Sequence, residues 1–481
     1  MRHAFPMDLI IDAAPQGVSA RAHLVDQLRN ALLAGQLHAG QPMPSTRVLA
    51  QAAGISRGTA VAAYEELAGE GYVEIVPGSG TFVAEGLPSL EGRTSIKTAP
   101  ADSVLSPASD SEGDSLINLS PGSPSTTFSG HRDWTAAWRR AQSAKLPALV
   151  PPPEGSAELR ERIAEHLHTA RGVACDPEEV LVTAGTSDAI GLLVHGLRAR
   201  GDRLRMATEN PGYTKAREVL NQLGATPVPI PLVDGGMDIE ELSNHSGALD
   251  AVILTPSHQY PLGGRLPVAS RLSVLEWARN SEAVVIEDDY DSEFRHGAAP
   301  LPAIASLDEE GRVVMVGSFS KTLTPWLRCG YLLVRDPLLR DRMISTRRAL
   351  GQPVSGIIQQ VLAEFMRSGG LRRHLGRVSR EYAHRRALVL ATTEDLAPEV
   401  RTHALEGGLH ATLTWTTGIT AESITAQLKH LRVAVTPLSR YYYESDCPDQ
   451  QGIVIGYGAP TDLELRTALQ QIRQVLLEIR E

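Results

Sequence analysis

Residues 317–332 read GSFSKTLTPWLRCGYL and place one lysine, Lys321, behind two serines and ahead of Arg328. The segment follows the apolar run VVMV at residues 313–316, which predicts a buried strand. We expect Lys321 to lie in the loop after this strand, where its amine can react with a carbonyl group. A single loop lysine is more often only solvated, so its chemistry depends on what the rest of the chain brings to it.

Apolar runs of the same kind recur between residues 116 and 481 and alternate with helical patterns. They include residues 180–183, 251–254 and 283–287. Short buried runs separated by helices predict an α/β domain whose mainly parallel sheet has helices on both faces. The ligand of such a domain lies beyond the carboxyl ends of the strands, so polar residues that directly follow these runs are candidates for its binding site.

Polar residues at these strand ends match the needs of pyridoxal phosphate. Lys321 would form the Schiff base, and a carboxylate has to pair with the pyridine nitrogen. Asp288 lies in IEDDY at residues 286–290, at the end of a buried strand where a carboxylate needs a partner. Tyr290 is placed to hydrogen-bond the phenolate oxygen of the ring. Acids that simply end a strand at the edge of the sheet are the alternative explanation.

The cofactor phosphate needs hydrogen-bond donors and a cation. The run AGTS at residues 184–187 follows a strand and opens a helix, so its N–H groups form an anion site. An arginine adds a bidentate contact to such a site. The hypothesis assigns five side chains to the phosphate, namely Thr186, Ser187, Ser318, Ser320 and Arg328.

Two aromatic side chains complete the hypothesis. Tyr213, in NPGY at residues 210–213, would stack on the face of the ring, although ordinary core packing explains it equally well. His258, in TPSHQYPLGG at residues 255–264, follows another strand end and would lie near the ring oxygen. A histidine with a purely structural role is the alternative there, and the sequence slightly favours it.

Residues 16–84 predict three helices and a hairpin. Ser45 or Thr46 caps the second helix, and Ser56 caps the third. Residues 72–83 then predict two short strands joined by a tight turn. This order is that of a winged helix-turn-helix, with a small helical cap domain as the alternative.

A winged helix-turn-helix reads the major groove with the first residues of its third helix. The predicted DNA contacts are Ser56, Arg57 and Thr59 at the groove, Ser45 and Arg47 at phosphates, and Gly78 and Ser79 at the wing tip. The segment from 16 to 84 carries four arginines against five acids, a net charge of −1. Affinity for DNA would therefore depend on a few placed arginines and on dimerisation.

The composition of the whole chain limits the classes of protein to which it can belong. The net charge of −10 over 481 residues argues against a polycation that coats nucleic acid, and three cysteines without paired spacing exclude a disulfide framework and a cysteine-rich zinc site. We predict no metal. No segment reads as a signal peptide or a membrane helix, so we expect a cytoplasmic protein. Residues 85–115, rich in Ser, Pro, Ala, Asp and Gly, predict a flexible linker.

The N-terminal segment resembles the GntR-type winged helix. The run PSTRVLAQAAGISRGTAVAAYEELAGEGYVEIVPGSGTFVA, residues 44–84, carries the resemblance, with PSTR, SRGTA and GSGTFV as its most specific parts. The resemblance covers the segment nearly end to end. It implies sequence-specific binding of double-stranded operator DNA.

The segment from 116 to 481 resembles the fold-type I aminotransferases. EDDYDSEFR, residues 287–295, and the run at residues 317–332 are the most specific pieces. Joined to a GntR-type helix-turn-helix, such a domain is typical of the MocR family of transcriptional regulators. The resemblance implies that Asp288 pairs with the pyridine nitrogen, Tyr290 with the phenolate oxygen, Lys321 with the aldehyde and Arg328 with the phosphate. It also implies a small C-terminal α+β subdomain from about residue 375 and a homodimer, which could be head-to-tail.

Three positions depart from the family pattern. Val150 stands where relatives often carry a tyrosine five residues before a glycine. The late strand at residues 451–457, QGIVIGY, lacks the arginine that grips a substrate carboxylate in aminotransferases. Lys215 stands two residues after Tyr213, at a position where a relative carries another basic residue. The lysine ammonium is a point charge and lacks the forked hydrogen-bonding geometry of a guanidinium.

These departures make productive transamination of ordinary amino acids an unfavoured hypothesis. We therefore expect a regulator whose effector is pyridoxal phosphate itself, or an amine or amino acid gripped by Lys215, Arg217 or Arg440. A working aminotransferase with an accessory N-terminal domain is the rival from another class. A sensor domain without cofactor is the third possibility.

Overall fold

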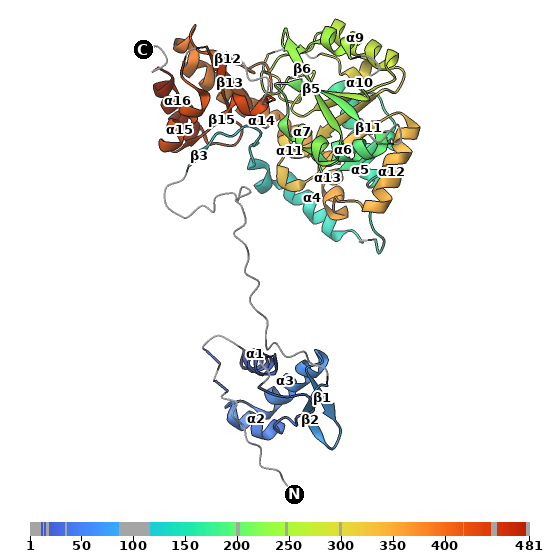
Figure 1. Cartoon of the computed structure of the whole chain (residues 1–481), viewed down its shortest axis with the longest axis vertical. Coiled ribbons are helices and arrows are strands. Elements are labelled where there is room, and N and C mark those ends of the chain that lie inside the picture. The colour runs from blue at the N-terminus through green and yellow to red at the C-terminus, as the bar shows by residue number, and fades with distance from the viewer. Residues whose placement is uncertain are drawn as a thin grey trace. The chain divides into compact units, whose positions relative to one another are not determined.

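The computed structural model describes residues 11–12, 14–15, 19–33, 36–85, 116–145, 147–198, 203–245, 249–297, 301–416, 418–443 and 450–477. The chain forms two compact units, Met1–Asp110 and Ser111–Glu481 (Figure 1). Nearly all of the predicted linker, residues 86–115, lies outside the described residues, as do residues 16–18.

The first unit is a bundle of three helices followed by a hairpin. Its elements are α1 (Ala20–Leu33), α2 (Thr46–Ala52), α3 (Arg57–Gly69), β1 (Val73–Val76) and β2 (Gly80–Val83). The Ser45 hydroxyl accepts a hydrogen bond from the N–H of Val48 at 3.4 Å, and the Ser56 hydroxyl accepts one from Thr59 at 3.1 Å. Both serines are therefore helix N-caps, and β1 pairs with β2 in antiparallel register. The prediction of a winged helix-turn-helix is confirmed.

One apolar core holds this unit together. Leu28, Leu49 and Leu67 come from α1, α2 and α3 respectively and are almost completely buried in it. Burying a leucine side chain contributes about 2 kcal/mol, so these contacts fix the angle between α2 and α3. The N-termini of these two helices are left at the surface.

The second unit is built on an eight-stranded sheet with the order β4-β11-β10-β9-β8-β5-β6-β7. Its strands are β4 (Val180–Thr183), β5 (Arg205–Asn210), β6 (Thr226–Val233), β7 (Gly236–Met237), β8 (Ala251–Leu254), β9 (Val284–Asp289), β10 (Val313–Ser318) and β11 (Gly330–Val334). Neighbouring strands from β10 to β6 are parallel, whereas β11 is antiparallel to both β10 and β4. The prediction of a mainly parallel sheet is confirmed.

Alternate residues of the central strands enter two separate cores. In β10, Val313 and Met315 pack into one core, and Val314 and Val316 pack into the other. The strands are apolar on both sides because helices cover both faces of the sheet (Figure 1). The first core contains residues of α4 (Arg132–Ser143), α5 (Ala157–Arg171), α8 (Ile239–Asn244), α9 (Val268–Asn280), α10 (Ile304–Leu307) and α13 (Gly356–Arg367). The second contains residues of α6 (Thr186–Leu197), α7 (Thr214–Gln222) and α12 (Pro337–Leu350).

A smaller α+β subdomain follows the sheet. Its antiparallel sheet has the order β12-β13-β16-β15, with β12 (Arg401–His403), β13 (His410–Trp415), β15 (Thr436–Pro437) and β16 (Gln451–Gly456). Its helices are α14 (Gly370–Thr393), α15 (Ala421–His430) and α16 (Asp462–Leu477). The long helix α14 enters this subdomain from the larger core, since Leu371 packs in the large core and Val378 in the small one.

The start of the second unit also belongs to the small subdomain in space. β3 (Ile117–Asn118) pairs in parallel with β14 (Val433–Ala434), and Leu119 is buried in the small subdomain's core. The sequence did not predict this pairing of segments that lie more than three hundred residues apart. It carries the next residues, Pro121 and Gly122, toward the end of the large sheet.

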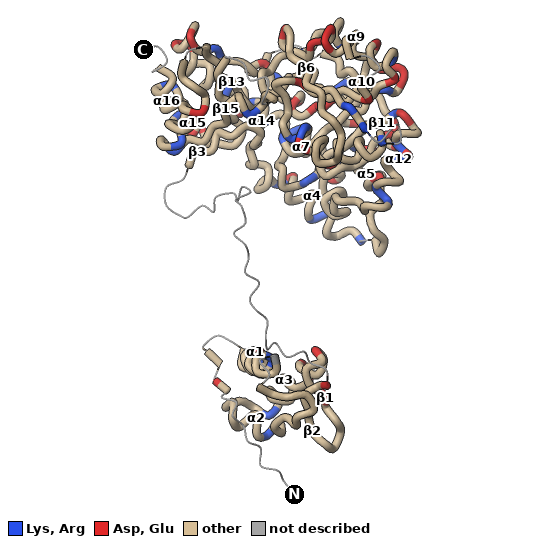
Figure 2. The backbone as a smooth tube through the Cα atoms, viewed as in Figure 1, with Lys and Arg blue, Asp and Glu red and all other residues tan. Residues whose placement is uncertain are grey.

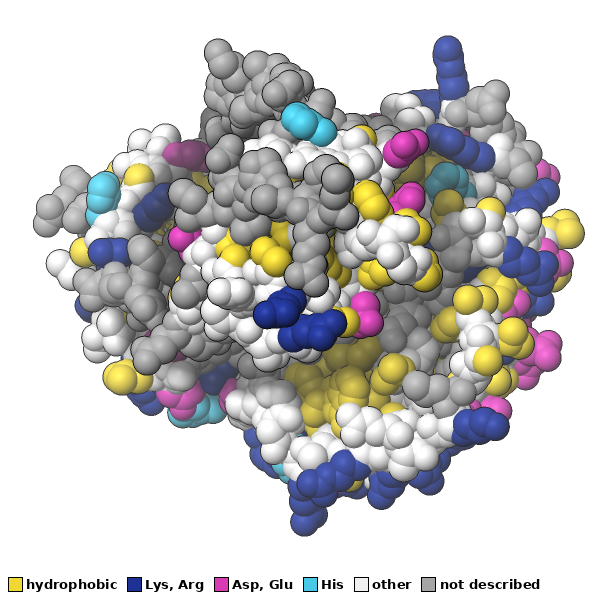
Figure 3. Space-filling model, turned by 90° about the horizontal axis from the view of Figure 1, so that it is seen from below, with side chains coloured by type: hydrophobic (Ala, Val, Ile, Leu, Met, Phe, Trp, Pro, Cys, Tyr) yellow, Lys and Arg dark blue, Asp and Glu magenta, His cyan; other side chains and the backbone are white. Residues whose placement is uncertain are grey.

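The described surface mixes both signs of charge. Basic and acidic residues are interspersed along both units (Figure 2), and side chains of both signs appear on the face in Figure 3. Within the described ranges, no helix has the length and apolar composition that crossing a bilayer requires.

Candidate functional site

A cavity of about 330 Å³ lies at the carboxyl ends of β9 and β10, beside the first turn of α6. Both parts of the second unit line it. The lining residues are Pro121, Gly122, Gly185, Thr186, Ser187, Tyr213, Lys215, Thr255, Tyr260, Asp288, Tyr290, Ser318, Ser320, Lys321, Pro325, Arg328, Leu409 and His410. Every side chain predicted to contact the cofactor is among them except His258.

Lys321 reaches into this cavity from a short helix. It was expected in a loop, but it lies in α11 (Phe319–Thr322), which starts directly after β10 because the Ser318 hydroxyl caps it. Its Nζ donates a hydrogen bond to the carbonyl oxygen of Gly122 at 2.6 Å. Burial lowers the pKa of the Lys321 ammonium, against the opposing effects of Asp291 and Asp288. A lysine with a lowered pKa offers a larger fraction of the neutral amine that attacks a carbonyl.

The three acids of the EDD run have different surroundings. Glu287 accepts hydrogen bonds from the N–H groups of Ile304 and Ala305, and Asp289 accepts one from Arg171 at 2.7 Å. Asp288 alternates with them along β9, so it faces the cavity. Among the described residues its Oδ1 has no hydrogen-bond partner.

The electrostatics of Asp288 point to a cationic partner. Burial raises the pKa of its carboxyl to about 7, with the charges of Asp289, Glu209 and Asp291 acting in the same direction. A buried carboxylate without a partner is costly, and a protonated ring nitrogen in the cavity would satisfy it. The structure thus singles out the middle acid of the run as the one that faces a ligand.

The opposite end of the cavity is suited to an anion. Gly185 precedes α6 with φ 93°, a conformation open to glycine, and leads into the N–H groups of Thr186 and Ser187. The hydroxyls of Ser318 and Ser320 lie 2.8 Å apart in front of them. A set of five predicted phosphate donors therefore meets in one place, namely Thr186, Ser187, Ser318, Ser320 and Arg328.

The predicted aromatic residues divide between two places. Tyr213 and Tyr290 line the cavity, and burial raises the pKa of Tyr213 to about 12, so its hydroxyl stays protonated. His258 lies behind Tyr290 and does not line the cavity. Its Nδ1 is 3.0 Å from the Tyr290 hydroxyl oxygen and 2.9 Å from an Asp291 carboxylate oxygen.

Several lining residues were missed by the sequence analysis. Thr255 and Tyr260 lie in the same run as His258, so the run itself was the available signal. The Tyr260 hydroxyl is 2.9 Å from that of Tyr441. His410, from β13, and Gly122 approach from the small subdomain, and no local pattern marks them in the sequence.

The three basic residues predicted for an effector are not equivalent. Lys215 lines the cavity, with its Nζ 2.6 Å from Glu218. Arg217 instead lies over the Tyr443 ring at 4.4 Å and donates a hydrogen bond to the Arg440 carbonyl oxygen. The side chain of Arg440 is not part of the described lining, so only Lys215 is brought to the cavity.

The winged helix separates its four arginines into two pairs. Arg21 and Arg29 form ion pairs of 2.8 Å with Glu66 and Glu70. Arg47 and Arg57 are exposed in α2 and α3, and neither forms an ion pair with a described residue. Among the described arginines of this unit, those without an ion pair therefore lie at the two helix N-termini.

The chain matches two known families along its length. Residues 20–83 match the family "Bacterial regulatory proteins, gntR family", and residues 114–446 match "Aminotransferase class I and II". The pyridoxine biosynthesis transcriptional regulator PdxR of Corynebacterium glutamicum is 38% identical over 97% of this chain and 98% of its own. The probable rhizopine catabolism regulatory protein MocR of Rhizobium meliloti is 33% identical over 96% of this chain and 94% of its own. The chain belongs to the MocR family of transcriptional regulators.

Solved structures place the second unit of this MocR-family chain among the aminotransferases in fold. An archaeal alanine:glyoxylate aminotransferase has a TM-score of 0.70 at 22% identity, covering 76% of this chain and 92% of its own. The kynurenine aminotransferase of Pyrococcus horikoshii has a TM-score of 0.68 at 24% identity, with the same coverage. At this identity the similarity is one of fold.

Family membership confirms two of the predictions made from the sequence. The protein is a DNA-binding transcriptional regulator, and pyridoxal phosphate is the cofactor of its aminotransferase-like unit. The cavity fits this group on three observations: a partly buried amine, a carboxylate oxygen without a partner among the described residues, and a cluster of anion donors.

Proposed function

We propose that this regulator senses whether pyridoxal phosphate occupies the Lys321 cavity and changes its affinity for operator DNA accordingly. The observation that carries the proposal is the convergence of the Lys321 amine, the unpartnered Asp288 oxygen and the anion donors of α6 in one cavity. The same chain carries a winged helix with available arginines at two helix N-termini. A ligand alters an equilibrium between two conformations only through its different affinity for them.

Within this proposal a subset of the lining residues holds the cofactor. When bound, pyridoxal phosphate supplies an aldehyde and an electron-withdrawing ring. Lys321 would hold the aldehyde carbon covalently, Asp288 would accept a hydrogen bond from the ring N–H, and Tyr290 would donate one to the phenolic oxygen. Tyr213 would cover one face of the ring. The phosphate is assigned to the hydroxyls and N–H groups at the start of α6, the serines of α11 and Arg328.

The proposed DNA interface lies at α2, α3 and the wing. Arg57 reads a base edge from the start of α3, and Arg47 holds a phosphate. Ser45, Ser56 and Thr59 cap or flank the same helix ends, and the Gly78-Ser79 turn lets the wing approach the backbone closely. The exposed, unpaired state of Arg47 and Arg57 supports this assignment.

The favoured effector is pyridoxal phosphate itself. QGIVIG in β16 contains no arginine, and Lys215, the cation near the cavity mouth, lies within ion-pair distance of Glu218. An amino-acid carboxylate would therefore lack a bidentate partner. The C. glutamicum relative is named for pyridoxine biosynthesis, which agrees with self-sensing. An amine or amino acid held by Lys215, Arg217 or Arg440 is the second candidate, and the name of the R. meliloti relative agrees with it.

The proposal includes a homodimer in the cytoplasm. Leu149, Val150 and Trp326 are each at least 85% exposed, which suits an interface with a second copy. A dimer presents two winged helices to a two-fold operator, so that a few arginines on each suffice. A head-to-tail arrangement is one possible form of this dimer.

Two measurements test the proposal. The purified protein should show the visible absorbance of lysine-bound pyridoxal phosphate and should select one DNA sequence from a random library. Single-turnover spectra with a panel of amino acids should leave that absorbance largely unchanged. Rapid, repeated conversion to the pyridoxamine form would instead establish the rival, a working aminotransferase with an accessory N-terminal domain. A protein that never shows the visible band would be a sensor without cofactor.

A further inference from the structure

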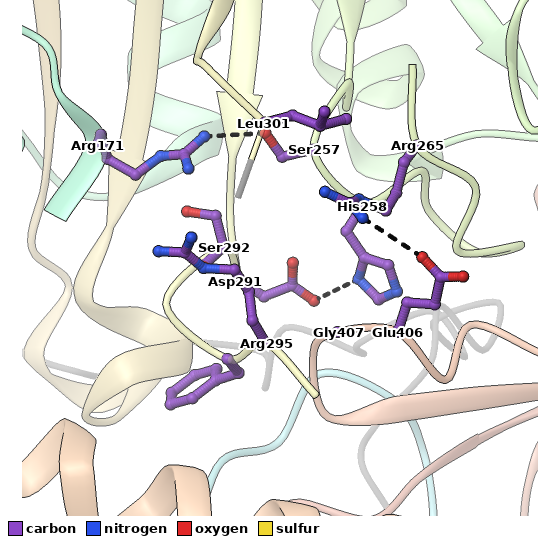
Figure 4. Close-up of a pocket in the computed structure, with 11 residues that line it drawn as sticks. Arg171, Ser257, His258, Arg265, Asp291, Ser292, Arg295, Leu301, Glu406 and Gly407 are labelled. Carbon is purple, nitrogen blue, oxygen red and sulfur yellow. Dashed lines mark hydrogen bonds and ion pairs between the residues drawn. The ribbon is translucent and has the colours of Figure 1, made fainter. Parts of the chain in front are cut away.

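His258 and Asp291 form a buried pair directly behind Tyr290. Their side chains come from the loop after β8 and the residue that follows Tyr290, and they are 4% and 1% exposed respectively. The distance from His258 Nδ1 to the Asp291 carboxylate is 2.9 Å (Figure 4), and that to the Tyr290 hydroxyl oxygen is 3.0 Å. Neither residue lines the cofactor cavity, and none of the proposed cofactor contacts uses them.

The pair influences where the hydrogen of the His258 ring and the hydroxyl hydrogen of Tyr290 lie. A carboxylate is only an acceptor, so Asp291 fixes the hydrogen of His258 on Nδ1. That N–H is then shared with the Tyr290 oxygen, which accepts. In this arrangement the Tyr290 hydroxyl hydrogen can be donated to a ligand oxygen in the cavity, and Asp291 is the alternative acceptor for it on the protein side. Burial and the nearby Asp291 charge raise the pKa of Tyr290 well above its ordinary value, so the donor stays protonated.

The backbone of the small subdomain encloses the pair closely. A Cβ on Gly408 would lie 2.2 Å from an Asp291 carboxylate oxygen and 2.8 Å from the His258 ring, and its φ is +72°. Glycine is therefore required where the chain passes this pair.

His258 also lines a separate small pocket. Nε2 is buried and has no hydrogen-bond partner among the described residues. The pocket beside it has a volume of about 20 Å³, enough for one water molecule. The charged and titratable groups around the pair include Arg171, Arg265, Arg295 and Glu406 at this pocket, His410 from β13, Tyr260, His296 and Tyr457, and Asp288 and Lys321 on the cavity side.

We propose that His258, oriented by Asp291, is a positioning residue for Tyr290: it keeps the tyrosine hydroxyl donating toward the phenolic oxygen of the cofactor and so favours the ionised form of that oxygen. The inference rests on the proposed function, because it needs pyridoxal phosphate bound at Lys321. His258 acts through Tyr290 and does not touch the cofactor.

The donor atoms of His258, Asp291 and His410 also lie within 4.8 Å of one another, a spacing that a metal ion could use. Hydrogen bonds explain this cluster more simply. The His258 Nδ1 is shared between Asp291 and Tyr290, and His410 Nε2 is 3.1 Å from the carbonyl oxygen of Pro261. A hydrogen-bond network needs no ion, and treatment with a chelator distinguishes the two.

The test measures the pH midpoint of the visible absorbance band in the full-length protein loaded with pyridoxal phosphate. His258→Leu removes the donor, and His258→Asn keeps an N–H near the Nδ1 position. We expect Tyr290→Phe to raise the midpoint by about one pH unit, since the ionised oxygen loses a charge-assisted hydrogen bond. His258→Leu should raise it by a smaller amount in the same direction, and His258→Asn should restore most of the difference.

The double variant decides whether the histidine works through the tyrosine. His258→Leu combined with Tyr290→Phe should shift the midpoint no further than Tyr290→Phe alone. Additive shifts, or a His258→Leu midpoint equal to that of the wild-type protein, would overturn the inference. A wild-type spectrum that changes on treatment with EDTA would replace it with a metal centre. A wild-type protein without any visible band would contradict the proposed function instead, so the two failures are distinguishable.

Discussion

Lys321 and Gly122 are joined by a hydrogen bond of 2.6 Å from the lysine Nζ to the glycine carbonyl oxygen. Gly122 follows β3, whose partner β14 belongs to the small subdomain. The reactive amine on the large sheet is therefore tied to a segment that packs with the C-terminal part of the chain. Covalent attachment of a cofactor would take the Lys321 nitrogen away from this carbonyl. We therefore expect occupancy of the cavity to affect the segment that contains Gly122.

This contact predicts a specific effect of Gly122→Ala. A Cβ at this position would lie 2.4 Å from the Lys321 Nζ, and the residue has φ +93°. We expect a loss of stability of about 1–3 kcal/mol from the backbone strain. We also expect at least tenfold weaker binding of pyridoxal phosphate, measured by titration of the visible band. Gly130→Ala is the matched control, since a Cβ there would have no other atom within 4 Å. Equal cofactor affinity in the two variants would refute the role of this contact.

Replacing Asp288 by asparagine should stabilise the cofactor-free protein by an amount that increases with pH. Its pKa rises from 3.8 in the unfolded chain to about 7 in the fold, mainly because of burial. The folded state therefore prefers the protonated carboxyl, and the protein loses stability as the pH rises from about 4 through 7. Asp288→Asn removes that loss. We expect the variant to be more stable than wild type at pH 8, by an amount on the order of 3 kcal/mol, and to gain little at pH 4.

Urea unfolding of both cofactor-free proteins at the two pH values measures this difference. The same Asn variant should bind pyridoxal phosphate more weakly, because its amide cannot offset a protonated ring nitrogen. A stability difference that does not change between pH 4 and pH 8 would show that Asp288 titrates normally. It would then be an ordinary strand-end acid.

Replacing the arginines of the winged helix should have two different effects on DNA binding, according to whether the arginine forms an ion pair within the protein. Arg47→Ala and Arg57→Ala should each weaken operator binding. Arg47→Ala should also reduce the slope of log Kd against log salt concentration by about one, the effect of one lost phosphate contact. Arg57→Ala should in addition relax the preference for one base pair. Arg21→Ala removes the same charge from an arginine that is already paired with Glu66, so it should leave the salt dependence unchanged. Fluorescence anisotropy over a range of salt concentrations distinguishes them, and equal slopes for all three would contradict the assigned interface.

The features that could be predicted from the sequence are those that depend on residues close together in the chain. Ser45 and Ser56 mark the starts of their helices by capping them, and the EDDY run ends a strand that is buried on both sides. Lys321 was expected in a loop, and the structure places it in a one-turn helix because the Ser318 hydroxyl caps the residues after β10. β11 resembles a parallel strand in sequence, since it too is buried on both faces, and only its pairing reveals its direction.

The missed site residues depend on contacts between distant segments. His410 reaches the cavity because β13 of the small subdomain packs against the loop that contains Pro261. Gly122 reaches it because β3 pairs with β14. His258 was expected beside the cofactor, and the structure sets it one layer behind, against Tyr290. Sequence patterns predict which strand end a residue follows, but they do not rank the residues at that end by distance from a ligand.

The central claim is that occupancy of Lys321 controls operator binding, and the most direct test compares operator affinity with and without pyridoxal phosphate. Wild-type protein and Lys321→Ala are stripped of cofactor and titrated onto operator DNA selected from a random library. We expect added cofactor to change the Kd of the wild-type protein about 5-fold or more and to leave that of Lys321→Ala unchanged. An equal response of both proteins, or a wild-type Kd that does not respond, would contradict it.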